Sequence, residues 1–279
     1  MGGGATTGGG ATTGDDATAG DAMTEKEPHV ERYQDINAQT IDRWIAEGWE
    51  WGTPIGHEAY VRACSGDWQV QLTPTKPVPR GWLGDLRGRR ILGLASGGGQ
   101  QGPLFMGAGA EVTILDYSSV QLASERAVAE REGYGIELVR ADMTKPLPFA
   151  DEVFDLVFNP VSICFIREVE PLWREVARVL KPGGALLTGF DTVVNYLVDE
   201  AEERIVWRQP FDPLTQPEAR AFLEADDAGM QFSHGLSETL GGMLRAGLTI
   251  VDVYEDTNGE GRLHELNVPT YLAVRATKS

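Results

Sequence analysis

Short apolar runs alternate with stretches of helical spacing along the middle of the chain. The predicted strands begin at Arg90 and continue with segments 111–116, 136–140, 154–159 and 185–188. Helices are predicted over 119–132, where apolar residues recur at helical spacing, and over 171–180. Strands that alternate with helices of this length are typical of βαβ units. The pattern therefore predicts an α/β fold with a doubly wound sheet.

Beyond this region the pattern changes twice. Residues 191–230 are rich in acids and interrupted by prolines, and they are too many for a simple connection between elements. A helix is then predicted over 237–246, followed by two further strands over 248–254 and 270–276.

A cluster of glycines follows the first predicted strand. Gly97, Gly99 and Gly102 fit the pattern G-x-G-x-x-G. Because glycine lacks a Cβ atom, a ligand can approach the peptide groups of such a turn closely. The pattern alone is equally compatible with a dinucleotide, with S-adenosylmethionine or with a tight loop.

Acids at the ends of the next strands narrow this choice. Asp116 ends the second apolar run, at the distance along the chain where an acid can bind ribose hydroxyls. Asp142 follows the third run, where it suits an exocyclic amine of adenine, with Met143 beside the ring.

The order of these features resembles the class I S-adenosylmethionine-dependent methyltransferases, over roughly residues 86–189. The resemblance rests on the glycine loop, on Asp116, on Asp142 with Asp155, and on the Lys-Pro-Gly-Gly turn at 181–184. It implies a Rossmann-like sheet in which the last strand runs antiparallel to the others, with S-adenosylmethionine as cofactor. The sequence of residues 94–101, together with residues 73–79 upstream, is also similar to a bacterial subgroup of the family, of small-molecule type, whose substrate is unknown.

The resemblance carries a set of binding positions to this chain. The implied cofactor-binding residues are Ala95, Ser96, Gly97, Gly98, Gly99, Asp116, Tyr117, Asp142, Met143 and Asn159. Two positions depart from the family pattern, because Gly93 stands where an acid is usual and Ala95 replaces the first glycine. Contact with the cofactor's amino group is therefore left to backbone carbonyls.

Three residues are candidates for the acceptor side. Asn159 and Ser162 lie at the end of the fourth predicted strand, and the Asn-Pro-Val-Ser sequence there partly matches the Asn-Pro-Pro-aromatic motif of enzymes that methylate amino groups. A structural alternative is that both side chains end the strand with local hydrogen bonds. His234, between the acidic segment and the next helix, is the histidine that we expect to act as a base.

The resemblance also divides the chain. We expect a methyltransferase domain over 86–279, in which 192–232 is an inserted substrate lid. Residues 29–85 form an aromatic extension, whose rings either pack the extension onto the sheet or, through Trp49, Trp51 or Tyr60, cap the active site.

The first residues of the chain have a different composition. Residues 1–28 begin with a tandem Gly/Thr-rich repeat, which predicts a disordered tail, because such a segment buries too little apolar surface to offset its ordering entropy. Two alternatives are a translation start placed too early, since Met23 opens an ordinary sequence, and a remnant of cloning.

Composition restricts the partners. A formal charge of −18 argues against nucleic acid, which basic patches bind, so we expect a small-molecule substrate. No apolar run has membrane-spanning length and no secretory leader is recognised, which favours the cytoplasm. Cys64 and Cys164 lack metal-type spacing and are expected as free thiols, with no bound metal. The oligomeric state is not indicated.

Two other functions fit part of the sequence. An NAD(P)-dependent oxidoreductase would share the glycine pattern and Asp116, but Asp142, the turn at 181–184 and the terminal pair of strands oppose it. A non-catalytic protein that binds S-adenosylmethionine is compatible with the missing acid at Gly93.

Overall fold

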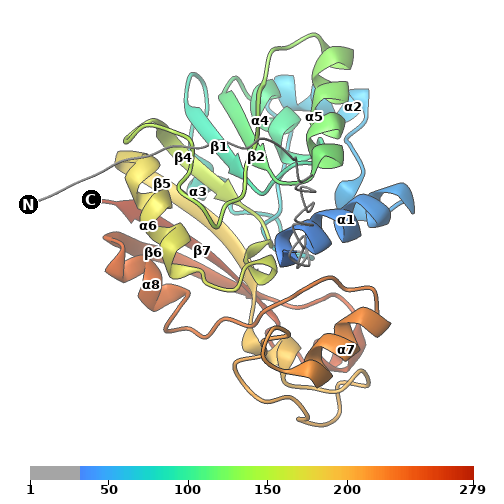
Figure 1. Ribbon diagram of the computed structural model, residues 1–279. Helices are drawn as coiled ribbons and strands as arrows, with labels where there is room; N and C mark the ends of the chain where they lie inside the picture. Colours follow the sequence, from blue (N-terminus) through green and yellow to red (C-terminus); the bar gives the residue numbers. More distant parts are fainter. Residues whose placement is uncertain (1–31) are drawn as a thin grey trace, which may run out of the picture. The chain divides into compact units, whose positions relative to one another are not determined.

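A seven-stranded sheet forms the centre of the computed structural model, which describes residues 32–279 (Figure 1). The predicted tail, 1–28, lies outside the described residues. The strands are β1 (Arg90–Leu94), β2 (Glu111–Asp116), β3 (Glu137–Arg140), β4 (Phe154–Asn159), β5 (Leu180–Asp191), β6 (Leu248–Asp256) and β7 (Tyr271–Lys278). Their order is β3-β2-β1-β4-β5-β7-β6, and β7 is antiparallel to both β5 and β6 while the other pairs are parallel. The predicted α/β sheet with a terminal antiparallel strand is confirmed.

Helices cover both faces of the sheet. They are α1 (Tyr33–Ala46), α2 (His57–Cys64), α3 (Arg80–Leu83), α4 (Gln101–Gly107), α5 (Ser119–Glu132), α6 (Glu170–Val179), α7 (Pro217–Ala225), α8 (Leu240–Arg245) and α9 (Gly261–Glu265), with 3-10 turns η1 (Glu50–Gly52), η2 (Ile163–Phe165) and η3 (Val193–Tyr196). One core lies between the sheet and α6 with α8, around the fully buried Trp173. A second core lies on the other face, where Phe105 of α4 contacts the rings of Trp68 and Phe158.

Helix α5 has the predicted bounds because both ends carry strong signals. The Ser118 side chain accepts a hydrogen bond from the backbone N–H of Gln121, which caps the first turn. Gly133 ends the helix in the left-handed conformation, at φ +77°.

The Lys-Pro-Gly-Gly segment differs from the prediction. The expected turn before a short strand is a bulge inside the longer strand β5, because Leu180 already pairs with Phe154 and pairing resumes with Ala185 opposite Leu156. Gly183 has φ +76° within this bulge, which explains why the sequence reads locally as a turn.

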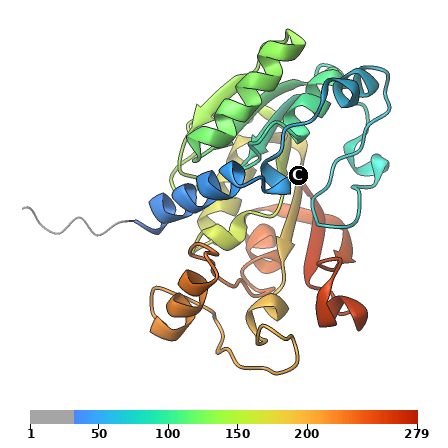
Figure 2. The ribbon, with the colours of Figure 1, turned by 90° about the vertical axis from the view of Figure 1, so that its right-hand side faces the viewer.

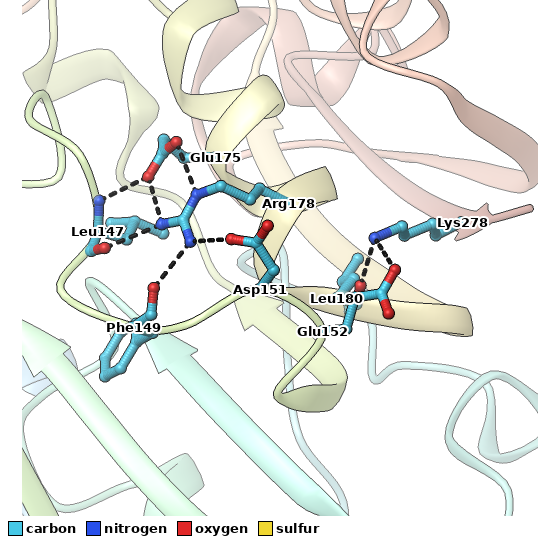
Figure 3. A network of polar contacts seen from close by, with 8 residues as sticks. All are labelled: Leu147, Phe149, Asp151, Glu152, Glu175, Arg178, Leu180 and Lys278. Atoms are coloured by element: carbon cyan, nitrogen blue, oxygen red, sulfur yellow. Dashed lines mark hydrogen bonds and ion pairs between the residues drawn. The ribbon is translucent and has the colours of Figure 1, made fainter.

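Arg178, at the end of α6, fixes the connection that leads from β3 to β4 (Figure 3). Its guanidinium donates to the carbonyl oxygens of Leu147 and Phe149 and also to the carboxylates of Asp151 and Glu175. A planar group with five donors can hold several acceptors at fixed positions. The connection that contains Asp142 is therefore tied to the helix layer.

The N-terminal extension crosses the carboxyl ends of the strands. In Figure 2, α1 passes between α5 and the segment that carries α7, and Figure 1 shows the same order. Asn37 of α1 exchanges two hydrogen bonds with the backbone of Met230, and Arg43 pairs with Asp227. The predicted insertion is thus bonded to the extension.

A second part of the extension packs directly against β5. A Cβ atom on Gly189 would lie 1.8 Å from the carbonyl oxygen of Leu72. Two backbones are therefore in contact at this point, and only glycine permits that approach.

We predict that Gly189→Ala lowers the free energy of unfolding by about 3 kcal/mol, because the added methyl group must push the Leu72 backbone off the sheet. For a chain of this size the melting temperature should fall by about 6–12 °C. Gly135→Ala is the matched control, since nothing lies within 4 Å of a Cβ atom there. Equal melting temperatures for the two variants would contradict the close approach.

Candidate active site

A cavity of about 430 Å³ lies at the carboxyl ends of the parallel strands. Its floor consists of the residues that end or follow these strands, and its walls come from α1, from η1 and from residues 71–74. Strand β1 lies between β2 and β4, so the connections diverge on either side of it. Ligands of open α/β sheets bind at this kind of switch point.

Most of the predicted site residues line this cavity. Those that do are Ala95, Ser96, Gly97, Asp116, Tyr117, Asp142, Met143 and Ser162. Gly98, Gly99, Asn159 and His234 are not among the lining residues.

Asp116 holds the first part of the glycine loop. Its carboxylate accepts hydrogen bonds from the backbone N–H groups of Gly97 and Ser118, at 3.0 and 2.9 Å. A Cβ atom on Gly97 would lie 2.9 Å from the same carboxylate, so glycine is needed there. Burial raises the pKa of Asp116 to about 6, against the opposing effect of these N–H donors.

The departures from the family pattern have a local explanation. Ala95 has φ +47°, a left-handed conformation that glycine adopts more easily. A Cβ atom on Gly93 would lie 2.5 Å from Cδ1 of Ile114, so an acidic side chain at this position would require the Ile114 side chain to move.

Glu125 holds the second part of the loop, and the sequence prediction missed it. Its Oε1 accepts a hydrogen bond of 2.8 Å from the backbone N–H of Gly99. Gly98 and Gly99 have φ +105° and +74°, and the Gly98 N–H donates to the backbone carbonyl of Gln121. Gly98 and Gly99 therefore anchor the loop to α5, on the side away from the cavity. The available signal was an acid at helical spacing on the apolar face of α5.

Burial raises the pKa of Glu125 to about 8, and the nearby charge of Asp116 adds to this effect. The folded protein therefore keeps Glu125 protonated at neutral pH.

Two carboxylate or amide oxygens of cavity-lining residues have no hydrogen-bond partner among residues 32–279. They are Oδ2 of Asp142 and Oε1 of Gln121, both buried in lining residues. The other oxygen of Asp142 accepts from the backbone N–H and the hydroxyl of Thr144. Buried acceptors are normally satisfied, so these atoms suit a ligand that brings N–H or O–H donors. An adenosine moiety has such donors on its ring and its ribose.

Asn159 lies beneath the cavity floor. Its Nδ2 donates to the carbonyl of Leu94 and to Oγ of Ser162, both at 2.8 Å, while its Oδ1 accepts from the hydroxyl of Thr188. Asn159 is fully buried, and these hydrogen bonds join β1, β4 and β5. Ser162 lines the cavity, and Asn159 orients its hydroxyl.

His234 lies elsewhere than expected. It is buried, and its Nε2 contacts the carbonyl oxygens of Ile163 and Ile166 at 3.0 and 2.9 Å, so this nitrogen carries the proton. Burial lowers the pKa of His234. The backbone N–H of Phe232 donates to the carbonyl of Cys164, which brings the segment in behind η2. The geometry thus gives His234 a contact that supports the cavity wall, and no contact with the cavity itself.

Some rings of the aromatic extension line the cavity, and others pack against the rest of the protein. Trp44, Trp49 and Trp51 line the cavity. Tyr60 instead stacks on Tyr134, with ring centroids 5.4 Å apart, and Trp68 packs against Phe105 in the core.

Asp191, the last residue of β5, lines the part of the cavity next to β5 and β7. The side chains of Cys164, Gln231 and Tyr271 line the cavity together with it. The hydroxyl of Tyr196 donates a hydrogen bond to Asp191, whose pKa burial raises to about 6. Sequence reasoning missed Asp191, although it shares with Asp116 the signal of an acid that ends an apolar strand.

Two features are absent from the described part of the chain. Within 32–279, no helix has both the length and the apolar character that crossing a membrane requires. Over the same range, no group of three or more His, Cys, Asp or Glu side chains is arranged to hold a metal ion.

Comparison with known sequences identifies relatives. A family model described as a methyltransferase domain matches residues 92–188. YbaJ, an uncharacterized methyltransferase of Bacillus subtilis strain 168, is 36% identical over 250 residues, which span 87% of this chain and 97% of YbaJ. A demethylmenaquinone methyltransferase of Renibacterium salmoninarum is 34% identical over 105 residues, 38% of this chain and 42% of that protein.

Comparison with solved structures agrees. An S-adenosylmethionine-dependent methyltransferase from Mesorhizobium loti superposes with a TM-score of 0.59 at 25% identity, covering 71% of this chain and 95% of the other. A 1,6-didemethyltoxoflavin-N1-methyltransferase from Burkholderia thailandensis gives a TM-score of 0.54 at 15% identity, covering 88% and 89%. The second similarity shows the fold alone.

The buried acid beneath the loop leads to a prediction about pH. Unfolded Glu125 loses its proton near its ordinary pKa of 4.5, whereas folded Glu125 keeps it up to about pH 8. The unfolded state then binds fewer protons across this window, so stability falls as pH rises through it. Between pH 5 and pH 8 the wild type should lose about 3 kcal/mol more than Glu125→Gln, which retains the Gly99 contact without titrating.

Chemical denaturation at the two pH values measures this difference. Glu130→Gln, at an exposed position of the same helix, is the control and should behave as the wild type. A Glu125→Gln variant with the same pH dependence as the wild type would rule out a protonated Glu125.

Proposed function

Because this chain belongs to the class I S-adenosylmethionine-dependent methyltransferases, we propose that it transfers the methyl group of S-adenosylmethionine to a small-molecule acceptor. The observation that carries the proposal is a cavity of about 430 Å³ that combines a glycine loop, unpartnered acceptor atoms and aromatic walls. Its volume falls in the range of small-molecule pockets, roughly 300–1,000 Å³. The Renibacterium relative is named for a small molecule, demethylmenaquinone.

The residues of the first part of the cavity fit the cofactor. We assign the ribose hydroxyls to Asp116, whose oxygens each retain a further lone pair after accepting from the backbone. Oδ2 of Asp142 accepts no hydrogen bond from residues 32–279, although Arg32 lies 3.9 Å away, and it suits the adenine amine, with Met143 against the ring. The backbone of Ala95 to Gly97 faces the remainder of the cofactor.

The chemistry requires placement rather than a reactive side chain. Bound S-adenosylmethionine supplies a methyl group on a positively charged sulfur. The tryptophans at 44, 49 and 51 exclude water and offer π faces to a cation, while Ser162 contributes a hydroxyl whose direction Asn159 fixes. The protein's contribution is orientation of the acceptor in a dry cavity.

The charge of the chain supports a small acceptor over a nucleic acid. With 42 acidic and 24 basic residues, the protein as a whole repels a phosphate backbone. Within the part of the chain that the structure describes, the lining residues include three aspartates and no lysine, arginine or histidine.

We predict that Asp116→Asn weakens the binding of S-adenosylhomocysteine by roughly tenfold to a hundredfold. The substitution removes the charge that strengthens hydrogen bonds from the ribose hydroxyls, at about 1.5–3 kcal/mol for bonds to a charged group. Calorimetric titration measures the affinity, and Asp67→Asn, an exposed position, is the control. Unchanged affinity, or tight binding of NADH by the wild type, would overturn the cofactor assignment.

We further predict methyl transfer to small molecules in a cell extract. Wild-type protein and the Asp116→Asn variant are each incubated with extract and with S-adenosylmethionine labelled on the methyl group. Label should accumulate, above the level seen with the variant, in the fraction that passes a filter retaining proteins and nucleic acids. Label in the retained fraction instead would refute a small acceptor, and label in neither fraction would favour a non-catalytic binding protein.

A further inference from the structure

Asp191 is a buried carboxylate that has no cationic partner among residues 32–279. It is 8% exposed and ends β5 at the cavity, opposite Tyr271 of β7 in the sheet register. Its hydrogen-bond donor is the hydroxyl of Tyr196 from η3. Of the described residues that line the cavity, none is a lysine, an arginine or a histidine.

The groups around Asp191 leave its charge uncompensated. Cys164 of η2, Tyr196 of η3 and Tyr271 of β7 face it, and burial raises the pKa of all three side chains, which therefore stay neutral at physiological pH. Burial raises the pKa of Asp191 itself only to about 6, so that it is mostly ionised at pH 7. A buried carboxylate is costly unless a positive charge or several donors accompany it.

The geometry points to an amine as the methyl acceptor, bound as an ammonium ion by Asp191, which then takes the proton that the nitrogen must lose before it can attack. This inference rests on the proposed function and names its substrate class. Asp191 is in this view both the counter-charge of the acceptor and the base of the reaction.

The proton transfer balances within the cavity. An ammonium N–H bond breaks, its electron pair stays on nitrogen as the free lone pair, and the proton binds a carboxylate oxygen of Asp191. Burial disfavours the charged forms of both groups, so the neutral pair of amine and carboxylic acid is more accessible here than in water. The lone pair then bonds to the methyl carbon as the carbon–sulfur bond breaks, and that bonding pair remains on sulfur. Asp191 later releases its proton to solvent.

The same arrangement selects against anionic acceptors. A carboxylate or phosphate would enter a cavity whose ionisable acids are Asp116, Asp142 and Asp191. Among residues 32–279 no lysine, arginine or histidine lines this cavity, and the cation that lies near one of these acids is Arg32, whose Nη1 is 3.9 Å from Oδ2 of Asp142. The three lining tryptophans favour a cation or a flat ring.

The test uses the full chain saturated with S-adenosylhomocysteine and three ring-matched probes: benzylamine, benzyl alcohol and benzoate. Calorimetry at pH 7.5 should show benzylamine binding at least tenfold more tightly than the other two. Asp191→Asn should abolish this preference while S-adenosylhomocysteine binds as before. Glu200→Gln, an exposed position after β5, should retain it. Equal binding of benzylamine and benzoate, no binding of benzylamine, or a preference that survives in Asp191→Asn would each overturn the inference.

Benzylamine binding measured over a range of pH distinguishes the contribution of the charge of Asp191 from that of its shape. Benzylamine binding should weaken as the pH falls below about 6, because Asp191 then becomes neutral. Tyr196→Phe removes the donor that favours the ionised form, so the loss should begin at a higher pH. An identical pH profile in this variant would count against the inference. Failure of S-adenosylhomocysteine to bind at all would instead refute the proposed function, so the two outcomes are distinguishable.

Discussion

Hydrogen bonds from backbone N–H groups to two buried carboxyl groups fix the loop on which the site depends. Asp116 accepts from Gly97 and Ser118, and Glu125 accepts from Gly99. A loop of glycines has many conformations available, and its ordering costs more entropy than that of other residues. Each carboxyl group selects one arrangement by satisfying donors that would otherwise be unpaired in a buried place. The raised pKa values of both acids reflect the same burial.

The rest of the cavity is assembled from segments that are distant in the chain. Helix α1 and the tryptophans of the extension form one wall, and the backbone at Leu72 reaches the sheet only because Gly189 has no side chain. Asn37 then joins α1 to the backbone at Met230 and Phe165. The extension therefore does more than cover apolar surface, because it connects the wall of the cavity to the segment between β5 and β6.

The sequence predicts those residues of the site whose position follows from a nearby helix end or strand end. The ends of α5 follow from Ser118 and Gly133, and Asp116 and Asp142 line the cavity because parallel strands end at one edge of the sheet. The prediction for His234 rested only on its place in the chain, between the acidic segment and the next helix. Its actual position follows from a backbone hydrogen bond between Phe232 and Cys164, which no local sequence pattern indicates. Glu125 was missed because a buried acid on a helix looks like an ordinary polar position.

Under the proposed function, this contrast assigns acceptor specificity to the segments outside the family match. The strand ends and the loop bound to Asp116 and Glu125 lie within residues 92–188, the part that matches the family model. Asp191, Tyr196 and Gln231 lie beyond it, and the tryptophan wall precedes it. The family-wide region thus contains the groups that suit a common cofactor. The flanking segments supply a carboxylate, a hydroxyl and aromatic faces, and differences in these groups can change the acceptor without disturbing the loop.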